Sequence, residues 1–139
     1  MTLLINSIDE LKKFIINNKN RFYKKKIILN GDLGSGKTTF VKILGEILGF
    51  KDIYSPTFTI MNIYKNNSDE MIHCDLYRIN SLIELENIGF FDYIDTDNTI
   101  CIEWGSKLNI ENYIDDYIEI FFEKVDEYKR KLTINETRR

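Results

Sequence analysis

Residues 31–38 read Gly-Asp-Leu-Gly-Ser-Gly-Lys-Thr, which has the spacing G-x-x-x-x-G-K-[ST] of a loop that wraps phosphate groups. The apolar run Ile27-Ile28-Leu29 precedes it and predicts a buried strand over residues 26–30. After the loop, apolar residues recur at helical spacing from Phe40 onward and predict a helix over residues 37–48. Because the motif lies between a strand and a helix, as its chemistry requires, it predicts nucleotide binding.

The residue types in this loop suit a polyphosphate. Glycines let backbone N–H groups approach phosphate oxygens closely, and the following helix points the positive end of its dipole at the same oxygens. Lys37 is expected to reach the β- and γ-phosphates, and the Thr38 hydroxyl is expected to bind Mg²⁺. The predicted nucleotide-binding residues are Gly31, Asp32, Leu33, Gly34, Ser35, Gly36, Lys37, Thr38 and Thr39. For Thr39, packing or a hydrogen bond at the start of the helix is the alternative.

The composition indicates one globular domain over residues 1–139, with 43% hydrophobic and 29% charged residues. No apolar stretch approaches the roughly 20 residues that a membrane-spanning helix needs, and charged residues interrupt the first 19 residues, unlike a signal peptide. Cys74 and Cys101 lie in apolar runs and are expected to be buried, reduced thiols. These features favour a cytoplasmic location.

The net charge of −3 argues against a protein that grips nucleic acid alone. Short basic clusters such as Lys129-Arg130-Lys131 are expected to be solvated surface, with contact to a partner or RNA as the alternative.

Helix and strand patterns alternate along the rest of the chain. Capping boxes at Ser7-x-x-Glu10 and Ser81-x-x-Glu84 predict two helix starts. The predicted helices are 8–18, 37–48, one that runs from 81 to Gly89, and a turn at 90–94; the predicted strands are 26–30, 57–65, 70–76, 99–102, 116–123 and 129–135. The second and third strands, and the last two, are expected to form antiparallel hairpins. The pattern predicts an α/β fold, a three-layer P-loop NTPase-like sandwich with a mainly parallel core sheet that carries antiparallel hairpins.

Acidic residues follow two of the predicted strands. Asp75 follows residues 71–74, and Glu103 follows residues 100–102. Because ligands bind beyond the carboxyl ends of parallel strands, these carboxylates are candidates to hold Mg²⁺ or to orient a water molecule. Ser55-Pro56-Thr57 is a third candidate, since proline stiffens a loop whose hydroxyls suit a metal ion. A solvated strand end, or a plain turn for the third segment, is the alternative in each case.

Together these segments resemble the TsaE (YjeE) family, small bacterial P-loop ATPases required to make threonylcarbamoyladenosine next to the tRNA anticodon. The resemblance rests on Gly31–Phe40, Ser55-Pro-Thr-Phe58, His73-Cys-Asp-Leu-Tyr-Arg78 and Ile102-Glu-Trp104, in the family's order. The match spans residues 26–108. Gly105-Ser106-Lys107 departs from the family, which often has proline or alanine and an acidic residue there.

The resemblance implies a Mg²⁺-dependent ATPase that is weak alone and works with the proteins TsaD and TsaB, meeting tRNA through their complex. By resemblance, Asp75 and Glu103 are the catalytic acidic pair, while Thr38, Thr57 and Glu103 are the metal ligands. Trp104 is placed near the nucleotide, with core packing as the alternative. His73 also belongs to the matched segment, but a lone histidine among apolar residues is interpreted as a core residue.

A small nucleotide or metabolite kinase is the alternative function. Such enzymes usually spread several arginines over a lid and an acceptor site. Arg78 is the only arginine between Arg21 and Arg130, which fits a kinase poorly. Arg78 is therefore the sole internal candidate for an arginine that neutralises a transferring phosphate, with a surface salt bridge as the alternative.

Overall fold

The computed structural model describes residues 1–53 and 60–139. Its strands are β1 (Thr2–Ile5), β2 (Lys26–Gly31), β3 (Met61–Lys65), β4 (Glu70–Asp75), β5 (Thr99–Glu103), β6 (Tyr117–Lys124) and β7 (Arg130–Thr137). Its helices are α1 (Ile8–Asn17), α2 (Lys19–Phe22), α3 (Lys37–Ile47), α4 (Leu82–Asn87) and α5 (Phe90–Ile94), with 3₁₀ helices η1 (Gly105–Leu108) and η2 (Ile110–Tyr113). Within the described residues, the strands form one seven-stranded sheet of order β1-β7-β6-β2-β5-β4-β3.

The middle of the sheet is parallel. β2 pairs in parallel with β5 and β6, and β4 pairs in parallel with β5, whereas β3–β4, β6–β7 and β1–β7 are antiparallel. The register sets Glu103 opposite both Leu29 and Asp75. The carboxyl ends of β2, β5 and β4 therefore meet at one edge, and the predicted parallel core with antiparallel hairpins is confirmed.

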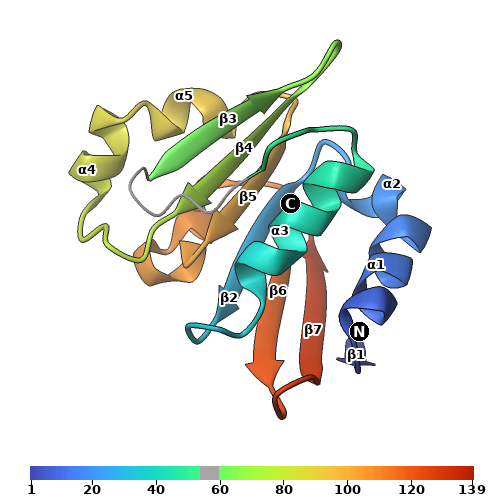
Figure 1. Ribbon diagram of the computed structural model, residues 1–139. Coiled ribbons are helices and arrows are strands. Elements are labelled where there is room, and N and C mark those ends of the chain that lie inside the picture. Colours follow the sequence, from blue (N-terminus) through green and yellow to red (C-terminus); the bar gives the residue numbers. More distant parts are fainter. Residues whose placement is uncertain (54–59) are drawn as a thin grey trace.

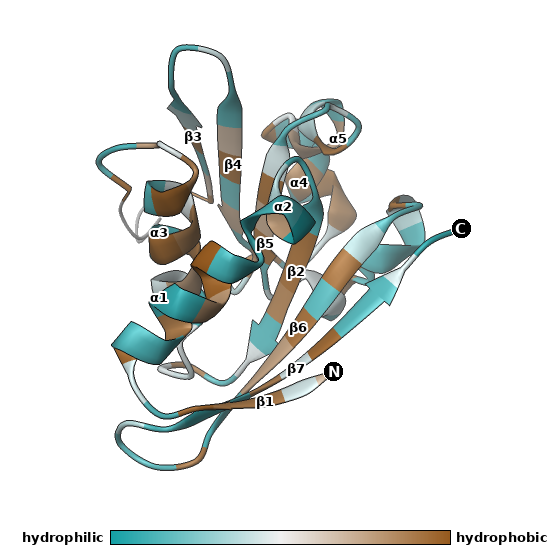
Figure 2. Ribbon diagram, turned by 90° about the vertical axis from the view of Figure 1, so that its right-hand side faces the viewer, coloured by the Kyte–Doolittle hydropathy of each residue, from teal (hydrophilic) through white to brown (hydrophobic). Residues whose placement is uncertain are grey.

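Helices cover both faces of the sheet, as Figures 1 and 2 show. Helices α1, α2 and α3 pack on one face, where Ile27 and Leu29 join a core with Phe40. Helices α4 and α5 lie on the other face, where Ile28 packs with Ile72. Because β2 is buried on both faces, its apolar residues form a continuous run instead of alternating. The three-layer α/β architecture is therefore the predicted one.

Both capping boxes act as predicted. The Ser7 hydroxyl accepts a hydrogen bond from the Glu10 N–H at 3.2 Å and starts α1, and Ser81 does the same for α4. The strand predicted over 57–65 begins at Met61 in the described residues, and residues 57–59 lie outside them. β1 and α2 were not predicted, because a four-residue strand and a single helical turn give too short a pattern. Within the described residues, no helix is both long and apolar enough to cross a bilayer.

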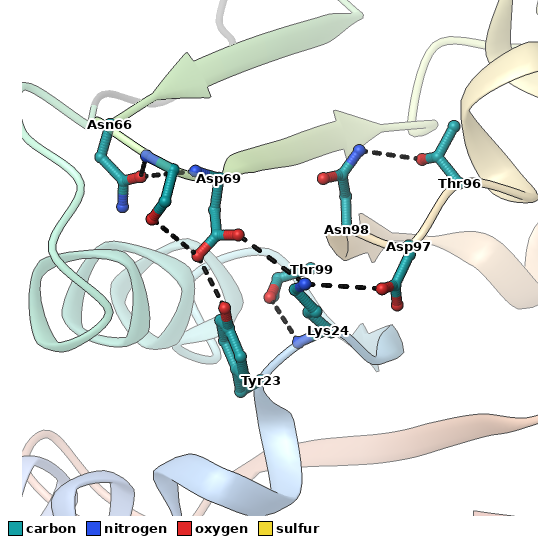
Figure 3. Close-up of polar contacts among 9 residues, drawn as sticks. Tyr23, Lys24, Asn66, Asp69, Thr96, Asp97, Asn98 and Thr99 are labelled. Atoms are coloured by element: carbon teal, nitrogen blue, oxygen red, sulfur yellow. Dashed lines mark hydrogen bonds and ion pairs between the residues drawn. The ribbon is translucent and has the colours of Figure 1, made fainter.

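A polar network ties the sheet together at the end opposite the phosphate-loop motif (Figure 3). The Lys24 N–H donates to the Thr99 hydroxyl at 2.8 Å, and the Tyr23 hydroxyl donates to Asp69 at 2.7 Å. The Lys24 ammonium lies 3.4 Å from Asp97 and 3.8 Å from Asp69. These contacts join the segments that lead into β2, β4 and β5. They therefore help to align the starts of the strands whose far ends carry the candidate site.

Candidate functional site

The loop between β2 and α3 needs glycine at defined points. Gly31 has φ of +151°, and a Cβ there would lie 2.5 Å from the Phe122 carbonyl oxygen on the neighbouring strand β6. Gly36 has φ of +111° and starts α3 from a left-handed conformation. Glycine is the residue that adopts such angles without strain. Local geometry, and not only phosphate contact, therefore explains glycine at positions 31 and 36.

Lys37 folds back over the loop that precedes it. Its side chain is 4% exposed, and its ammonium donates to the Gly31 carbonyl at 2.5 Å and to the Asp32 carbonyl at 3.0 Å. The same ammonium lies 4.4 Å from the centre of the Trp104 ring, a cation–π contact. Burial lowers the pKa of Lys37, although the Glu103 carboxylate acts in the opposite direction.

A buried polar chain leads from α3 across the sheet. The Thr38 hydroxyl lies 2.9 and 3.0 Å from the two Glu103 carboxylate oxygens, to which it donates. His73 Nε2 hydrogen-bonds Glu103 Oε2 at 2.5 Å from the next strand. Glu103 is 2% exposed and His73 is fully buried. A charge so deeply buried is tolerated only with partners, and Thr38 and His73 are those partners.

Asp75 ends β4 beside Glu103. Its side chain is half-buried and accepts a hydrogen bond from the Tyr77 N–H at 3.0 Å. Burial raises the pKa of Asp75 most, the Tyr77 hydrogen bond lowers it, and the nearby Glu103 carboxylate raises it further. A carboxylate with a raised pKa at the edge of a cavity accepts a proton more readily than one in open water.

These groups surround a cavity of about 290 Å³ at the carboxyl edge of the sheet. Its lining comprises Leu33, Gly34, Ser35, Gly36, Lys37, Thr38, Thr39, Asp75, Glu103, Trp104 and Arg130. Gly31 and Asp32 belong to the loop but do not line the cavity. Thr57, together with Ser55 and Pro56, lies outside the described residues. The structure therefore brings together most of the residues that the sequence singled out.

Comparison with known proteins gives the same family as the motifs. The family model described as "Threonylcarbamoyl adenosine biosynthesis protein TsaE" matches residues 5–132. This chain belongs to the TsaE family. It is 43% identical to the tRNA threonylcarbamoyladenosine biosynthesis protein TsaE of Borreliella burgdorferi over 67% of this chain and 72% of that protein. The Aquifex aeolicus protein of the same name is 39% identical over 78% of this chain and 74% of its own length.

The fold also matches a solved structure. The crystal structure of Bacillus subtilis YdiB superposes with a TM-score of 0.70, covers 99% of this chain and 84% of that chain, and is 26% identical in sequence. The TsaE match extends beyond residues 26–108, over which the sequence motifs had carried the resemblance. The family match therefore includes β6 and the first residues of β7, both predicted from pattern alone, and the superposition extends over the rest of β7.

Arg130 is a site residue that the sequence did not reveal. The cluster at 129–131 was expected to be solvated surface, but the Arg130 guanidinium donates to the Ser35 carbonyl at 3.1 Å and to the Gly34 carbonyl at 3.4 Å. Arg78, the candidate for a phosphate-neutralising arginine, is exposed and does not line the cavity. The β6–β7 hairpin was predicted, but only the pairing of β6 beside β2 brings residue 130 to the loop, and no local pattern signals that pairing.

His73 is buried, as its core interpretation predicts, but it also contacts a candidate catalytic residue. The signal for this contact was its place in the matched segment two residues before Asp75. On a strand, residues two apart point to the same face, so a polar residue at 73 shares the face of Asp75. The apolar neighbours of His73 concealed that relation.

A second, larger cavity adjoins the first in this TsaE family member. It has a volume of about 560 Å³ and lies between the start of α1, the loop and the β6–β7 turn. Its walls include Ile5, Leu11, Phe122 and Leu132, which are apolar, while Ser35, Gly36, Thr39 and Arg130 line both cavities. A ligand that fills the smaller cavity can therefore extend into an apolar recess.

Proposed function

We propose that this protein binds ATP with Mg²⁺ and hydrolyses it slowly, in support of threonylcarbamoyl transfer to the tRNA adenosine next to the anticodon. The observation that carries the proposal is the convergence of Lys37, Thr38, Asp75 and Glu103 on one cavity beside the glycine loop. Membership of the TsaE family supports the pathway, and by resemblance the partners are TsaD and TsaB. A cytoplasmic location is part of this proposal.

The donor atoms fit Mg²⁺. The Thr38 hydroxyl and the Glu103 carboxylate are hard oxygen donors that already lie within 3.0 Å of each other, and Mg²⁺ prefers oxygen ligands. Within the described residues, no three His, Cys, Asp or Glu side chains gather as a metal site. Thr38 and Glu103 are therefore the described residues that would hold Mg²⁺ beside the phosphates. The ion would supply positive charge against the negative charge of the phosphates.

The side chains then have separate tasks. The loop amides and Lys37 bind the phosphates, which requires the ammonium to exchange the Gly31 and Asp32 carbonyls for phosphate oxygens. Asp75 orients a water molecule that attacks the γ-phosphorus, and the bond to the β-phosphate oxygen breaks. Because its pKa is raised, Asp75 is also a suitable acceptor for the proton of that water. His73 holds the Glu103 carboxylate in place.

The second cavity supports a nucleotide as the ligand. An apolar recess suits a flat base, and this recess shares four residues with the phosphate cavity. We place the base and ribose there, with the phosphates against the loop. ATP should therefore bind much more tightly than inorganic tripolyphosphate, which fills the smaller cavity alone. Equal affinity for the two would remove this assignment.

The kinase alternative receives less support. Among the described residues, Arg130 is the arginine that lines the cavity, and its guanidinium is engaged by carbonyls of the loop. A kinase needs free arginines that clamp a second phosphorylated substrate. Arg78 is exposed away from the cavity, so no such clamp is supported.

The deciding experiment measures phosphate release from ATP by the purified protein, with and without TsaB, TsaD and tRNA. We expect slow release alone, stimulation by the partners, and no release by a Lys37→Ala variant under either condition. Transfer of phosphate to a nucleoside or metabolite would instead establish a kinase.

A further inference from the structure

Charge is distributed very unevenly along this chain. Residues 79–123, about a third of the sequence, contain eleven of its 22 acidic residues but only one of its 19 Lys and Arg residues, Lys107. The remaining residues therefore carry a net positive charge, although the whole chain is at −3. The acidic segment includes α4, α5, η1, η2 and most of β6. Such a field selects positively charged partners and repels nucleic acid.

An apolar groove lies within this acidic segment. It has a volume of about 570 Å³ and is lined by Leu82, Ile83, Glu86, Gly89, Phe91, Asp92 and Tyr113. Ile83 is 68% exposed and Tyr113 is 47% exposed, while the Phe91 and Tyr113 rings pack edge to face at 5.5 Å. The helices α4 and α5 that form it lie on the face of the sheet away from α1 and α3 (Figures 1 and 2).

The polar rim of the groove is acidic and unneutralised. Glu86 and Asp92 line it and are exposed, and neither forms an ion pair within the described residues. Exposed apolar side chains inside a polar rim are typical of protein interaction sites. The complementary occupant has an apolar side chain for the groove and Lys or Arg side chains for the rim.

We propose that the groove between α4, α5 and η2 is the docking site for such a segment of the partner protein, and that the partner is the TsaB–TsaD assembly. This inference rests on the proposed function for the identity of the partner. The charge and shape of the groove supply the chemistry of contact. Basic residues of the partner speed its approach, and the apolar contact at Ile83 provides most of the affinity.

The groove is also connected to the nucleotide site. The segment that enters α4 starts at Asp75, and the segment that starts at Trp104 passes through η1 before it reaches η2. The Tyr77 and Trp104 rings contact each other with centroids 5.1 Å apart, and the Lys107 ammonium donates to the Tyr77 carbonyl at 2.5 Å. A partner seated in the groove therefore contacts α4 and Tyr113, which lie at the far ends of the two segments that start at Asp75 and Trp104. Docking there should change turnover as well as bring the proteins together.

The test compares two surface variants with matched controls. Ile83→Glu places a charge in the groove, and Glu86→Lys reverses the charge of its rim. Ile16→Glu on α1 and Glu46→Lys on α3 make the same changes at exposed positions on the opposite face. Binding to immobilised TsaB–TsaD is measured by biolayer interferometry, and ATP affinity and thermal unfolding are measured on each variant alone.

We expect the two groove variants to bind TsaB–TsaD at least about tenfold more weakly and to lose partner-stimulated turnover. The two controls should bind within about twofold of the wild type, and all four variants should keep ATP affinity and melting temperature. Unchanged binding by Ile83→Glu, or equal loss in the controls, overturns the docking site and leaves the ATPase proposal intact. If the wild type does not bind TsaB–TsaD, both the proposed partner and this docking site are overturned. The measurement of ATP affinity tests the ATPase proposal independently.

The same set of variants also tests two other occupants of the groove, a second copy of this chain and RNA. Self-association of the wild type in sedimentation velocity, abolished by Ile83→Glu, would show that a second copy covers the groove. A loss of direct tRNA binding in Ile83→Glu, without loss of TsaB–TsaD binding, would assign the face to RNA. Either result overturns the proposal.

Discussion

Replacing Lys37 by methionine should weaken nucleotide binding strongly but change the stability of the ligand-free protein little. The ammonium now donates to two loop carbonyls, bonds worth about 1.5–3 kcal/mol each because the donor is charged, and it contacts the Trp104 ring, worth about 1 kcal/mol. Against them stands the cost of burying a charge, which reaches several kcal/mol. Because the two contributions nearly cancel, the free energy of unfolding without ligand should change by less than about 2 kcal/mol.

The loss of ATP affinity should be much larger. Two charge-assisted hydrogen bonds to phosphate oxygens are worth about 3–6 kcal/mol together, or roughly 10²- to 10⁴-fold in affinity. At an ATP concentration of about 1,000 times Kd, the wild type gains about 4 kcal/mol of stability, which is roughly 12 °C in Tm for a chain of this size. At the same concentration the variant should gain about 4 °C or less.

Differential scanning fluorimetry with and without Mg²⁺-ATP measures both effects, and calorimetry gives the affinities. Lys42→Met, one turn further along α3, is the matched control and should retain the full ATP-dependent rise in Tm. Burial lowers the pKa of Lys37 below its ordinary 10.5, so the unfolded chain holds that proton more tightly. Wild-type stability should therefore rise between the lowered pKa and 10.5, and the methionine variant should lack this rise. A full ATP-dependent shift in the variant would refute the assignment of the loop.

Three further predictions concern the acidic pair and the ring beside it. Glu103→Gln and Asp75→Asn should each lower phosphate release at least about 100-fold, measured with partners present, while ATP affinity changes less than about tenfold. Normal turnover in both variants would show that these residues do not belong to the site. Because burial raises the pKa of Asp75 above 3.8, the folded protein loses stability as the pH rises through that pKa, so Asp75→Asn should be more stable than the wild type in urea at about pH 7.5 and equal at about pH 3.5. Trp104 is the only tryptophan, so Mg²⁺-ATP should change the intrinsic emission as Lys37 leaves its ring, and an unchanged spectrum at saturation would contradict that movement.

The sequence was most informative where local chemistry decides the structure. The capping boxes at Ser7 and Ser81 and the glycine loop each act through residues a few positions apart, so their outcome was readable. The strand order could not be predicted in this way, because the predicted β6–β7 hairpin joins the sheet through the pairing of β6 with β2, across about 90 residues. Short elements such as β1 are fixed by the strand beside them, and their own patterns are weak.

The residues of the candidate site also differ in how far they could be predicted from local sequence. Lys37, Thr38, Asp75 and Glu103 were identifiable because each follows a strand or loop whose end must face the ligand. The bond between His73 and Glu103 joins adjacent strands, and its existence depends on the register that pairs β4 with β5. Arg130 reaches the loop from 95 residues away, so only the folded sheet identifies it.

The Arg130 contact has a bearing on how the loop acquires its shape. In a planar trans peptide the C=O and the following N–H point in opposite directions. By holding the Ser35 carbonyl, the Arg130 side chain turns the Gly36 amide hydrogen toward the other side of the loop. A nascent chain emerging from the ribosome possesses the whole glycine motif long before residue 130 is synthesised. Until the β6–β7 hairpin forms, the glycine motif is complete in sequence, but nothing holds the Gly36 amide in its binding orientation.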